Sequence, residues 1–141
     1  MRHLSWGLTM FGAIGALGLG AILAQADSFA GRADFGPANA FERKAAWGQG
    51  DAGACRILNP TITIRKDGTA KFNGQVASTH GDDAYCVILD FFDRNQVKLF
   101  HFPRICSPTL RSTFTEWTNP NLAIPQEHIP FIVFATREDH C

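Results

Sequence analysis

The chain has 141 residues, and its 13 Lys and Arg residues balance its 13 Asp and Glu residues, so its formal net charge is zero. A chain without excess positive charge lacks the general attraction for phosphates that draws proteins to nucleic acids and anionic membranes. We therefore expect no nucleic-acid partner. The length fits one domain with a single core.

Residues 1–26 have the pattern of an export signal. Arg2 gives a weakly basic head, residues 4–23 carry no charge, and Ala24-Gln25-Ala26 offers the small residues that signal peptidase recognises. A membrane anchor is the alternative, because about 20 uncharged residues can cross a bilayer. Glycines dilute the run, however, and no cluster of Lys or Arg follows it. The pattern predicts a secreted, extracellular protein, cleaved after Ala26, with no stable membrane anchor after cleavage.

Residues 27–53 are rich in Ala and Gly and are predicted to be a lead-in segment before a β domain at residues 54–141. Pro37 at a first-turn position and Gly48 as a stop are compatible with a short N-terminal helix of roughly three turns, and equally with a loop. In either case Phe41 and Trp47 are expected to cover one end of the core.

Runs of β-branched and aromatic residues, separated by Asp-Gly, Asn and Pro, predict strands from Cys55 onward. The first hairpin is predicted to turn at Lys66-Asp67-Gly68, with Gly68 in the left-handed conformation. Ile64 then faces Ala70 and Ile62 faces Phe72, so the apolar side chains share one face. The other face is expected to be wet and carries Thr61, Thr63, Arg65, Lys71, Asn73 and Gln75.

The second hairpin is predicted to turn at Asp93-Arg94-Asn95-Gln96, between strands at residues 84–92 and 97–102. The predicted facing pairs are Phe92 with Val97, Asp90 with Leu99, Ile88 with His101, and Cys86 with Pro103. The first of these strands is apolar on both faces, which indicates a place in the middle of a sheet.

Three segments complete the chain. Residues 109–117 are predicted to form an edge strand, residues 119–130 a proline-rich surface loop, and residues 131–135 a last buried strand. The total is about six strands. The sequence therefore predicts an all-β fold, either an antiparallel sandwich or a small barrel.

Four cysteines in an exported domain of this size predict two disulfides, rather than a four-thiolate zinc site, because such sites use close pairs such as C-x-x-C. The second hairpin brings Cys106 back towards Cys86. Cys55 begins the first strand and Cys141 ends the last, so these two meet if those strands are antiparallel neighbours. We predict the bonds Cys86–Cys106 and Cys55–Cys141, with no metal and no cofactor.

Several short motifs occur in a recognisable order between residues 47 and 100. They are Trp47 with Gly50-Asp51 and Cys55, then Asp67-Gly68-Thr69-Ala70-Lys71-Phe72, then Asp82-Asp83-Ala84-Tyr85, and Asp93-Arg94-Asn95. In this order they resemble a family of small secreted, mostly bacterial proteins that is classed as a domain of unknown function. Residues after 102 match it poorly. The resemblance implies secretion and an all-β fold, and it implies no activity and no site residue.

Two sets of side chains are candidates for catalysis. Asp90 and His101 are predicted to share one face of the second hairpin at diagonal positions, where a carboxylate can orient an imidazole for general-base work. A structural pair on a half-exposed face is the alternative, since no Ser or Cys nucleophile is placed nearby. Arg111, Glu116 and His128 together contain the groups for phosphodiester transfer, although no spacing rule links them.

Other residues are candidates for binding. Trp47, Tyr85 and Trp117 offer an aromatic platform for a sugar or peptide, or else they are core residues. The threonine-rich face around Thr61 is a second contact surface, and the Asp82-Asp83 turn is a calcium candidate with too few ligands. We therefore expect a secreted, disulfide-stabilised binding module for an unknown extracellular ligand, with a small secreted hydrolase as the alternative.

Overall fold

The structure is a computed structural model that describes residues 31–37 and 39–141. The predicted export signal and its cleavage point lie outside these residues. Within the described part of the chain, no helix has both the length and the apolar character needed to span a bilayer.

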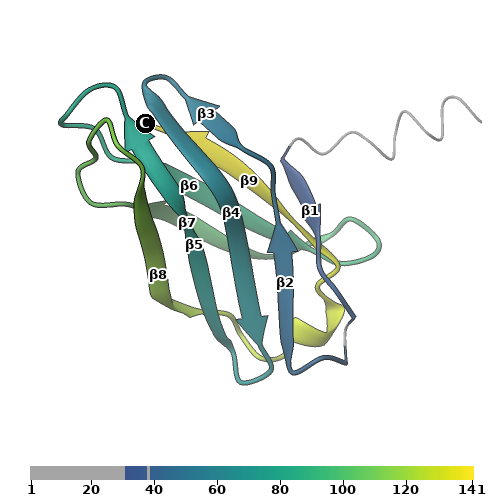
Figure 1. Cartoon of the computed structure of the whole chain (residues 1–141). Coiled ribbons are helices and arrows are strands. Elements are labelled where there is room, and N and C mark those ends of the chain that lie inside the picture. The colour runs from purple at the N-terminus through teal and green to yellow at the C-terminus, as the bar shows by residue number, and fades with distance from the viewer. Residues whose placement is uncertain (1–30, 38) are drawn as a thin grey trace, which may run out of the picture. The chain divides into compact units, whose positions relative to one another are not determined.

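Two antiparallel sheets pack face to face in a sandwich (Figure 1). The strands are β1 (Arg32–Asp34), β2 (Glu42–Ala46), β3 (Gly50–Ala52), β4 (Cys55–Arg65), β5 (Thr69–Ser78), β6 (Cys86–Phe92), β7 (Lys98–Cys106), β8 (Thr115–Ala123) and β9 (Phe134–His140). One sheet has the order β1-β9-β6-β7, and the other has the order β2-β4-β5-β8 with β3 paired to β4. The predicted all-β fold is confirmed, and of the two predicted architectures it is the sandwich.

The core fills the space between the two sheets. Ile62, Ile64 and Phe72 face inward from one sheet, and Val87, Leu89 and Phe91 from the other, all with no exposed surface. Because side chains alternate along a strand, each of these inward residues leaves its neighbours on the outer face. Burying one such side chain is worth about 1.5–3 kcal/mol relative to leaving it exposed.

The first hairpin has the predicted register. Ile64 pairs with Ala70 and Ile62 with Phe72. Gly68 has φ +91°, and a Cβ there would lie 2.9 Å from the carbonyl oxygen of Ile124, so the position needs glycine for both its conformation and its space. The outer face is polar as predicted, except that Thr63 is covered by its neighbours and is 5% exposed.

The predicted register of the second hairpin is wrong by one or more residues. Its loop has three residues, Arg94-Asn95-Gln96, with Gln96 at φ +65° and the Asp93 N–H donating to the Val97 carbonyl. Phe92 therefore pairs with Lys98, not Val97. Further register shifts along β6 and β7 place Asp90 opposite His101. The loop was not recognised because the left-handed position carries glutamine instead of the usual glycine.

The short N-terminal helix is also a wrong prediction. The lead-in segment contributes β1 to one sheet, and β2 and β3 to the other. In β2, Arg43 and Ala45 face the core while their neighbours are exposed, which is the period of a strand. Phe41, expected to cover the core, is 63% exposed, whereas Trp47 is buried as expected.

Two corrections apply to the C-terminal third. Strand β8 begins and ends later in the chain than the predicted edge strand, and it includes Pro120. Proline is tolerated there because β8 is at the edge of its sheet, and because a register shift between Ala70 and Phe72 of the partner strand creates a bulge at this point. Residues 129–131 form a 3₁₀ turn, labelled η1 (Ile129–Phe131), so the last strand starts at Phe134 and not at Phe131.

The disulfides join the predicted pairs of cysteines, Cys55 with Cys141 and Cys86 with Cys106. Cys86 and Cys106 are direct register partners within one sheet. Cys55 and Cys141 belong to different sheets, so the reason given for their meeting, that β4 and β9 are neighbours, is wrong. That bond instead ties the two sheets together across 86 residues of chain, worth about 4 kcal/mol on the chain-entropy model.

Candidate functional site

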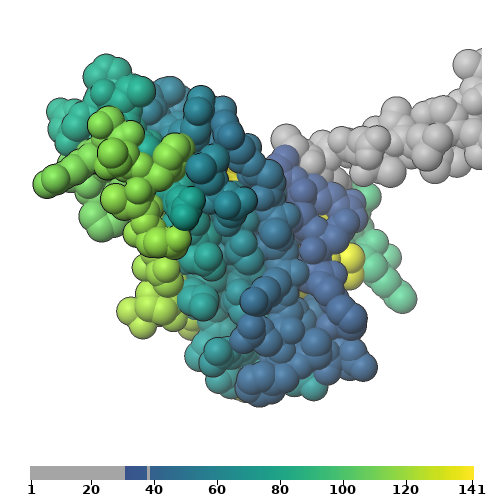
Figure 2. Space-filling model, viewed as in Figure 1, coloured from purple at the N-terminus to yellow at the C-terminus, as the bar shows by residue number. Residues whose placement is uncertain are grey.

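The outer face of the five-stranded sheet is polar along β4 and β5, and we call it the polar face. It arises because β4 and β5 turn Ile and Phe inward, so that hydroxyl, amide and charged side chains point outward. Figures 1 and 2 look onto this face. It contains the threonine-rich surface that was predicted as a contact site.

Three hollows follow one another along the polar face. The first, of about 250 Å³, is lined among others by Asp51, Arg56, Ser78, Thr79, Ser112 and Phe114. The second, of about 80 Å³, is lined by Leu58, Asn59, Asn73, Gly74, Gln75 and Glu116. The third, of about 270 Å³, is lined by Thr63, Arg65, Thr69, Ala70, Lys71 and Pro120. Each takes residues from both β4 and β5 or their immediate ends, so the hollows lie in sequence along the strands.

The charges on the polar face are largely paired with one another. Arg56 Nε lies 2.8 Å from Asp51 Oδ1, and Arg65 Nε lies 3.2 Å from Glu42 Oε2. The hydrogen bond from Arg56 holds the pKa of the Asp51 carboxyl below its usual range. These pairs are exposed and contribute little to stability. They present alternating donors and acceptors without a strong net field.

Asp90 and His101 are in direct contact on the outer face of the other sheet. Asp90 Oδ1 accepts a hydrogen bond from His101 Nδ1, and Lys98 Nζ lies 3.4 Å from Asp90 Oδ2. The carboxylate therefore orients the imidazole, as expected for a general base. The imidazole is nearly half exposed, and none of the hollows described above lies over it.

Glu116 and His128 are not brought together. Glu116 lies near the start of β8 and binds the Gln75 side chain, whereas His128 follows the end of that strand, next to η1. From Glu116 to the end of β8 at Ala123 the strand rises by roughly 20 Å, and His128 lies beyond that end. The aromatic platform is also wrong, since Trp47, Tyr85 and Trp117 are all buried and Trp117 packs edge-on against Phe72.

A buried polar cluster was missed by the sequence analysis. Arg137 and Asp139 face inward from β9 and form an ion pair of 2.8 Å. The Tyr85 hydroxyl lies beside the Asp139 carboxylate, and burial together with that carboxylate raises the pKa of Tyr85 well above its usual value. A Cβ on Gly50 would lie within 2.9 Å of all three side chains. Gly50 and Tyr85 belonged to the quoted motifs, which was the only sequence signal for this cluster.

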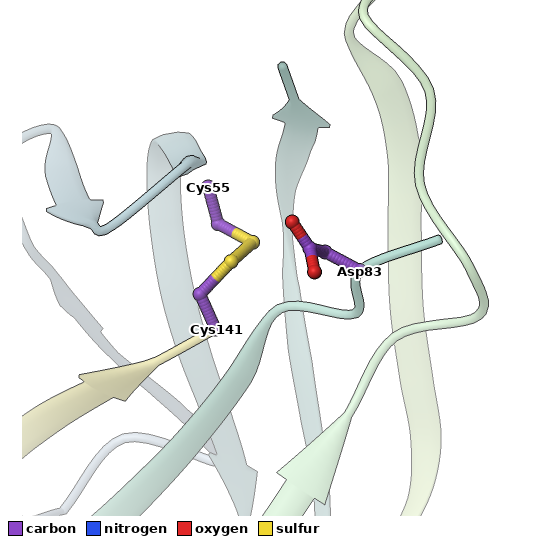
Figure 3. A group of neighbouring side chains, drawn as sticks. All are labelled: Cys55, Asp83 and Cys141. Carbon is purple, nitrogen blue, oxygen red and sulfur yellow. A yellow bond between two sulfur atoms is a disulfide. The ribbon is translucent and has the colours of Figure 1, made fainter. Parts of the chain in front are cut away.

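A second feature missed by the sequence is the carboxylate beside the inter-sheet disulfide. Figure 3 shows the Asp83 side chain pointing towards the Cys55–Cys141 bond. One ligand atom from each of the three residues lies within 4.8 Å of the others. Asp83 Oδ2 accepts a hydrogen bond of 3.0 Å from Ser78 Oγ, and His80 Nδ1 lies 3.9 Å away. While the sulfurs are bonded to each other, they offer no thiolate to a metal.

These features define a disulfide-stabilised antiparallel β-sandwich with a polar outer face and no assembled catalytic set among the described residues. Residues 61–129 match the sequence profile of a family described as a family of unknown function (DUF6294). The predicted resemblance to an uncharacterised domain family is thereby confirmed, but the match continues to residue 129, where poor similarity was expected after residue 102, and it leaves out the motifs at residues 47–55. Searches of curated proteins and of solved structures return no match.

The matched residues cover both predicted hairpins, the Cys86–Cys106 disulfide and most of the polar face. Trp47, Gly50, Cys55 and Cys141 lie outside the match. The inter-sheet disulfide and most of the buried polar cluster therefore belong to parts of the chain beyond the matched region.

Proposed function

We propose that this protein is an exported binding module that holds a neutral, hydroxyl-rich polymer such as a linear polysaccharide on its polar face. Residues 1–26 support export, since they have the composition of a signal that is cleaved after Ala26. The two disulfides support it independently, because such bonds persist in oxidising compartments.

The observation that carries this proposal is the line of three hollows along β4 and β5. A row of hollows on one flat face suits an extended polymer better than a compact small molecule, which binds in a single deep pocket. The row extends from Phe114 to Arg65, over most of the length of these strands.

The chemistry of the lining favours a neutral polymer. Amides of Asn73 and Gln75 and hydroxyls of Thr69 and Thr79 donate and accept hydrogen bonds with little charge. The paired guanidinium and carboxylate of Arg56 and Asp51 can bind neighbouring hydroxyl groups together. The exposed ring of Phe114 offers an apolar surface at one end of the row.

Affinity electrophoresis tests the proposal. The purified oxidised protein is run through gels containing glucan, mannan or xylan, with heparin as an acidic comparison. We expect retardation by at least one neutral polysaccharide, and loss of it in the double variant Arg56→Ala/Gln75→Ala. His101→Ala, on the opposite sheet, is the matched control and should keep binding. Absence of retardation by every neutral polymer, or equal retardation of the double variant, would refute the proposal.

The direct contact of Asp90 with His101 supports a second candidate, the small secreted hydrolase. In this case His101 acts as the base that activates a water molecule, and Asp90 holds its ring. Turnover of RNA, peptidoglycan or ester substrates by the purified protein, abolished in a folded His101→Ala variant, is the expected result. Activity that survives this substitution would eliminate the candidate.

A further inference from the structure

Three segments that are distant in the sequence meet at the inter-sheet disulfide. Cys55 begins β4, Cys141 follows β9, and Asp83 lies in the loop between β5 and β6. Figure 3 shows the carboxylate directed at the two sulfur atoms. Cysteine thiolates and carboxylate oxygens both bind zinc, and a catalytic-type site uses three protein ligands with water in the fourth position, whereas the sulfurs of a disulfide are not thiolates.

We propose that this disulfide conceals a metal site. When a thiol reductant opens the bond, Cys55, Cys141 and Asp83 hold one Zn²⁺, with water in the fourth position. In the first step two reductant thiols become one disulfide, and Cys55 and Cys141 each become a thiol. In the second step Zn²⁺ replaces the two thiol protons, which pass to solvent, so the ion bridges the two sheets in place of the sulfur–sulfur bond.

The geometry suits zinc because little movement is needed. The Cα atoms of Cys55 and Cys141 lie 5.7 Å apart, and all three ligand atoms lie within 4.8 Å of one another. Tetrahedral zinc holds sulfur at about 2.3 Å and oxygen at about 2.0–2.2 Å, so its ligands lie within this spacing. The hydrogen bond from Ser78 fixes the Asp83 carboxylate, as partners of metal-binding carboxylates commonly do.

The site is open to entry from one side. Cys55 is buried, while Cys141 is exposed and the Asp83 side chain is about one third exposed. Because Cys141 is the more exposed residue of the pair, we expect the reductant to attack its sulfur, with Cys55 as the leaving thiol. The open side also leaves room for the water that completes the coordination.

The second disulfide provides a comparison within the same chain. Cys86 and Cys106 are also bonded to each other. Among the described residues, however, three possible ligand atoms come together at Cys55, Asp83 and Cys141, and not at the second disulfide. Reduction of Cys86–Cys106 should therefore produce two thiols without a metal site. Comparing the two reduced pairs therefore distinguishes zinc binding at a three-ligand site from the general affinity of cysteine thiols for zinc.

Cobalt is the probe, because its thiolate complexes absorb in the near ultraviolet and its tetrahedral complexes absorb in the visible range. The protein is reduced, and the reductant is removed without air before Co²⁺ is added. The variant Cys86→Ser/Cys106→Ser should show both absorptions and lose them when Zn²⁺ is added. The variant Cys55→Ser/Cys141→Ser should show neither. Equal spectra from the two variants, or no thiolate absorption in the first, would overturn the proposal.

A pair of neighbouring acids tests the third ligand. Asp83→Asn in the first variant should weaken Co²⁺ binding by at least about tenfold, and Asp82→Asn should leave it unchanged. Equal effects of the two changes would overturn the assignment of Asp83. If reduction unfolds the protein, Zn²⁺ should restore its circular dichroism spectrum, since metal binding and folding are then linked. Failure to restore it also counts against the site.

Discussion

Among the described residues, two arginine side chains reach the interior, one from each sheet, and they are stabilised in different ways. Arg43 of β2 is 4% exposed, and its four hydrogen bonds to described residues, of 2.7–3.1 Å, all end on backbone carbonyls. Arg137 of β9 is paired with the Asp139 carboxylate at 2.8 Å, next to Tyr85. Arg43 thus depends on peptide carbonyls, whereas Arg137 has a carboxylate partner together with one longer hydrogen bond, of 3.4 Å, to the Gly48 carbonyl.

The difference shows what each arginine contributes. The carbonyls that Arg43 binds belong to Gly36, which follows β1, and to Ile129 and Ile132, which begin and follow η1. Among the described residues these carbonyls have no neighbouring strand to pair with, so the guanidinium of Arg43 donates the hydrogen bonds that backbone N–H groups of such a strand would otherwise donate. Burial lowers the pKa of Arg43, but a guanidinium stays charged at any ordinary pH. The Arg137 cluster, by contrast, contains the phenol of Tyr85, whose pKa is raised by burial and by Asp139, so its contribution to stability depends on pH.

The largest effect is expected from Arg43→Met, which keeps the apolar length and removes every donor. The buried Ile132 carbonyl then loses this partner, the Ile129 carbonyl keeps only the 3.4 Å bond from the Ile132 N–H, and four bonds from a charged donor are lost, so we expect a loss of about 4 kcal/mol. Urea unfolding followed by tryptophan fluorescence measures it. Arg65→Met is the control, since its ion pair is exposed, and it should cost less than about 1 kcal/mol. Similar losses in both variants would show that the backbone carbonyls are not what Arg43 satisfies.

Asp139→Asn is expected to have the second largest effect and to lower the free energy of unfolding by about 3 kcal/mol, because it leaves the Arg137 charge buried without its counter-ion. The double variant Arg137→Met/Asp139→Leu removes both charges and should regain most of this loss. The comparison uses the same urea unfolding experiment. A double variant no more stable than Asp139→Asn would mean that packing, and not the unpaired charge, determines the cost.

The two hairpins show how far the fold can be predicted from the sequence. In the first, Gly68 marks the left-handed position, and the alternation of Ile62 and Ile64 with polar residues fixes the register. In the second, the same loop geometry is hidden because Gln96 occupies the left-handed position. The first of its strands is apolar on both faces except for Asp90, so the hydrophobic pattern fixes the register less firmly than in the first hairpin.

The candidate site was predictable only where it depends on one hairpin. The polar face follows from the first hairpin, and the Asp90–His101 contact was anticipated as a diagonal neighbour on the second. The Arg137 cluster and the Cys55–Asp83–Cys141 group each join elements that are far apart in the chain. A residue spacing does not reveal such contacts, because they are set by how the two sheets pack.

Gly50→Ala should lower the free energy of unfolding by a smaller amount, about 2 kcal/mol, because the added methyl group crowds the side chains of the Arg137 cluster. An added Cβ would lie 2.5 Å from Arg137 Nη2 and from Asp139 Oδ2, so these side chains must shift within a packed interior. Gly48→Ala is a matched control two residues away, where a Cβ meets nothing within 4 Å, and it should be nearly neutral. Equal stability of the two variants would mean that the cluster is loosely packed.

The smallest effect at neutral pH, and the most specific, comes from Tyr85, the one tyrosine of the chain. Its pKa is raised in the folded protein by burial and by Asp139, while the unfolded chain ionises near pH 10. Above about pH 10 the folded state therefore holds a proton that the unfolded state has lost. Stability should fall there by about 1.4 kcal/mol per pH unit until the folded tyrosine ionises, with no such term below pH 10.

Tyrosinate absorbance reads this group alone, because no other residue in the chain contributes to it. We expect the absorbance to appear only as the protein unfolds at high pH, and Asp139→Asn to allow it earlier in the folded state, since the carboxylate is one of the causes of the shift. Arg43→Met should leave the midpoint of the folded tyrosine unchanged, which would separate the pH-dependent arginine site from the pH-independent one. Titration near pH 10 in the folded native protein would show instead that Tyr85 is not sealed beside Asp139.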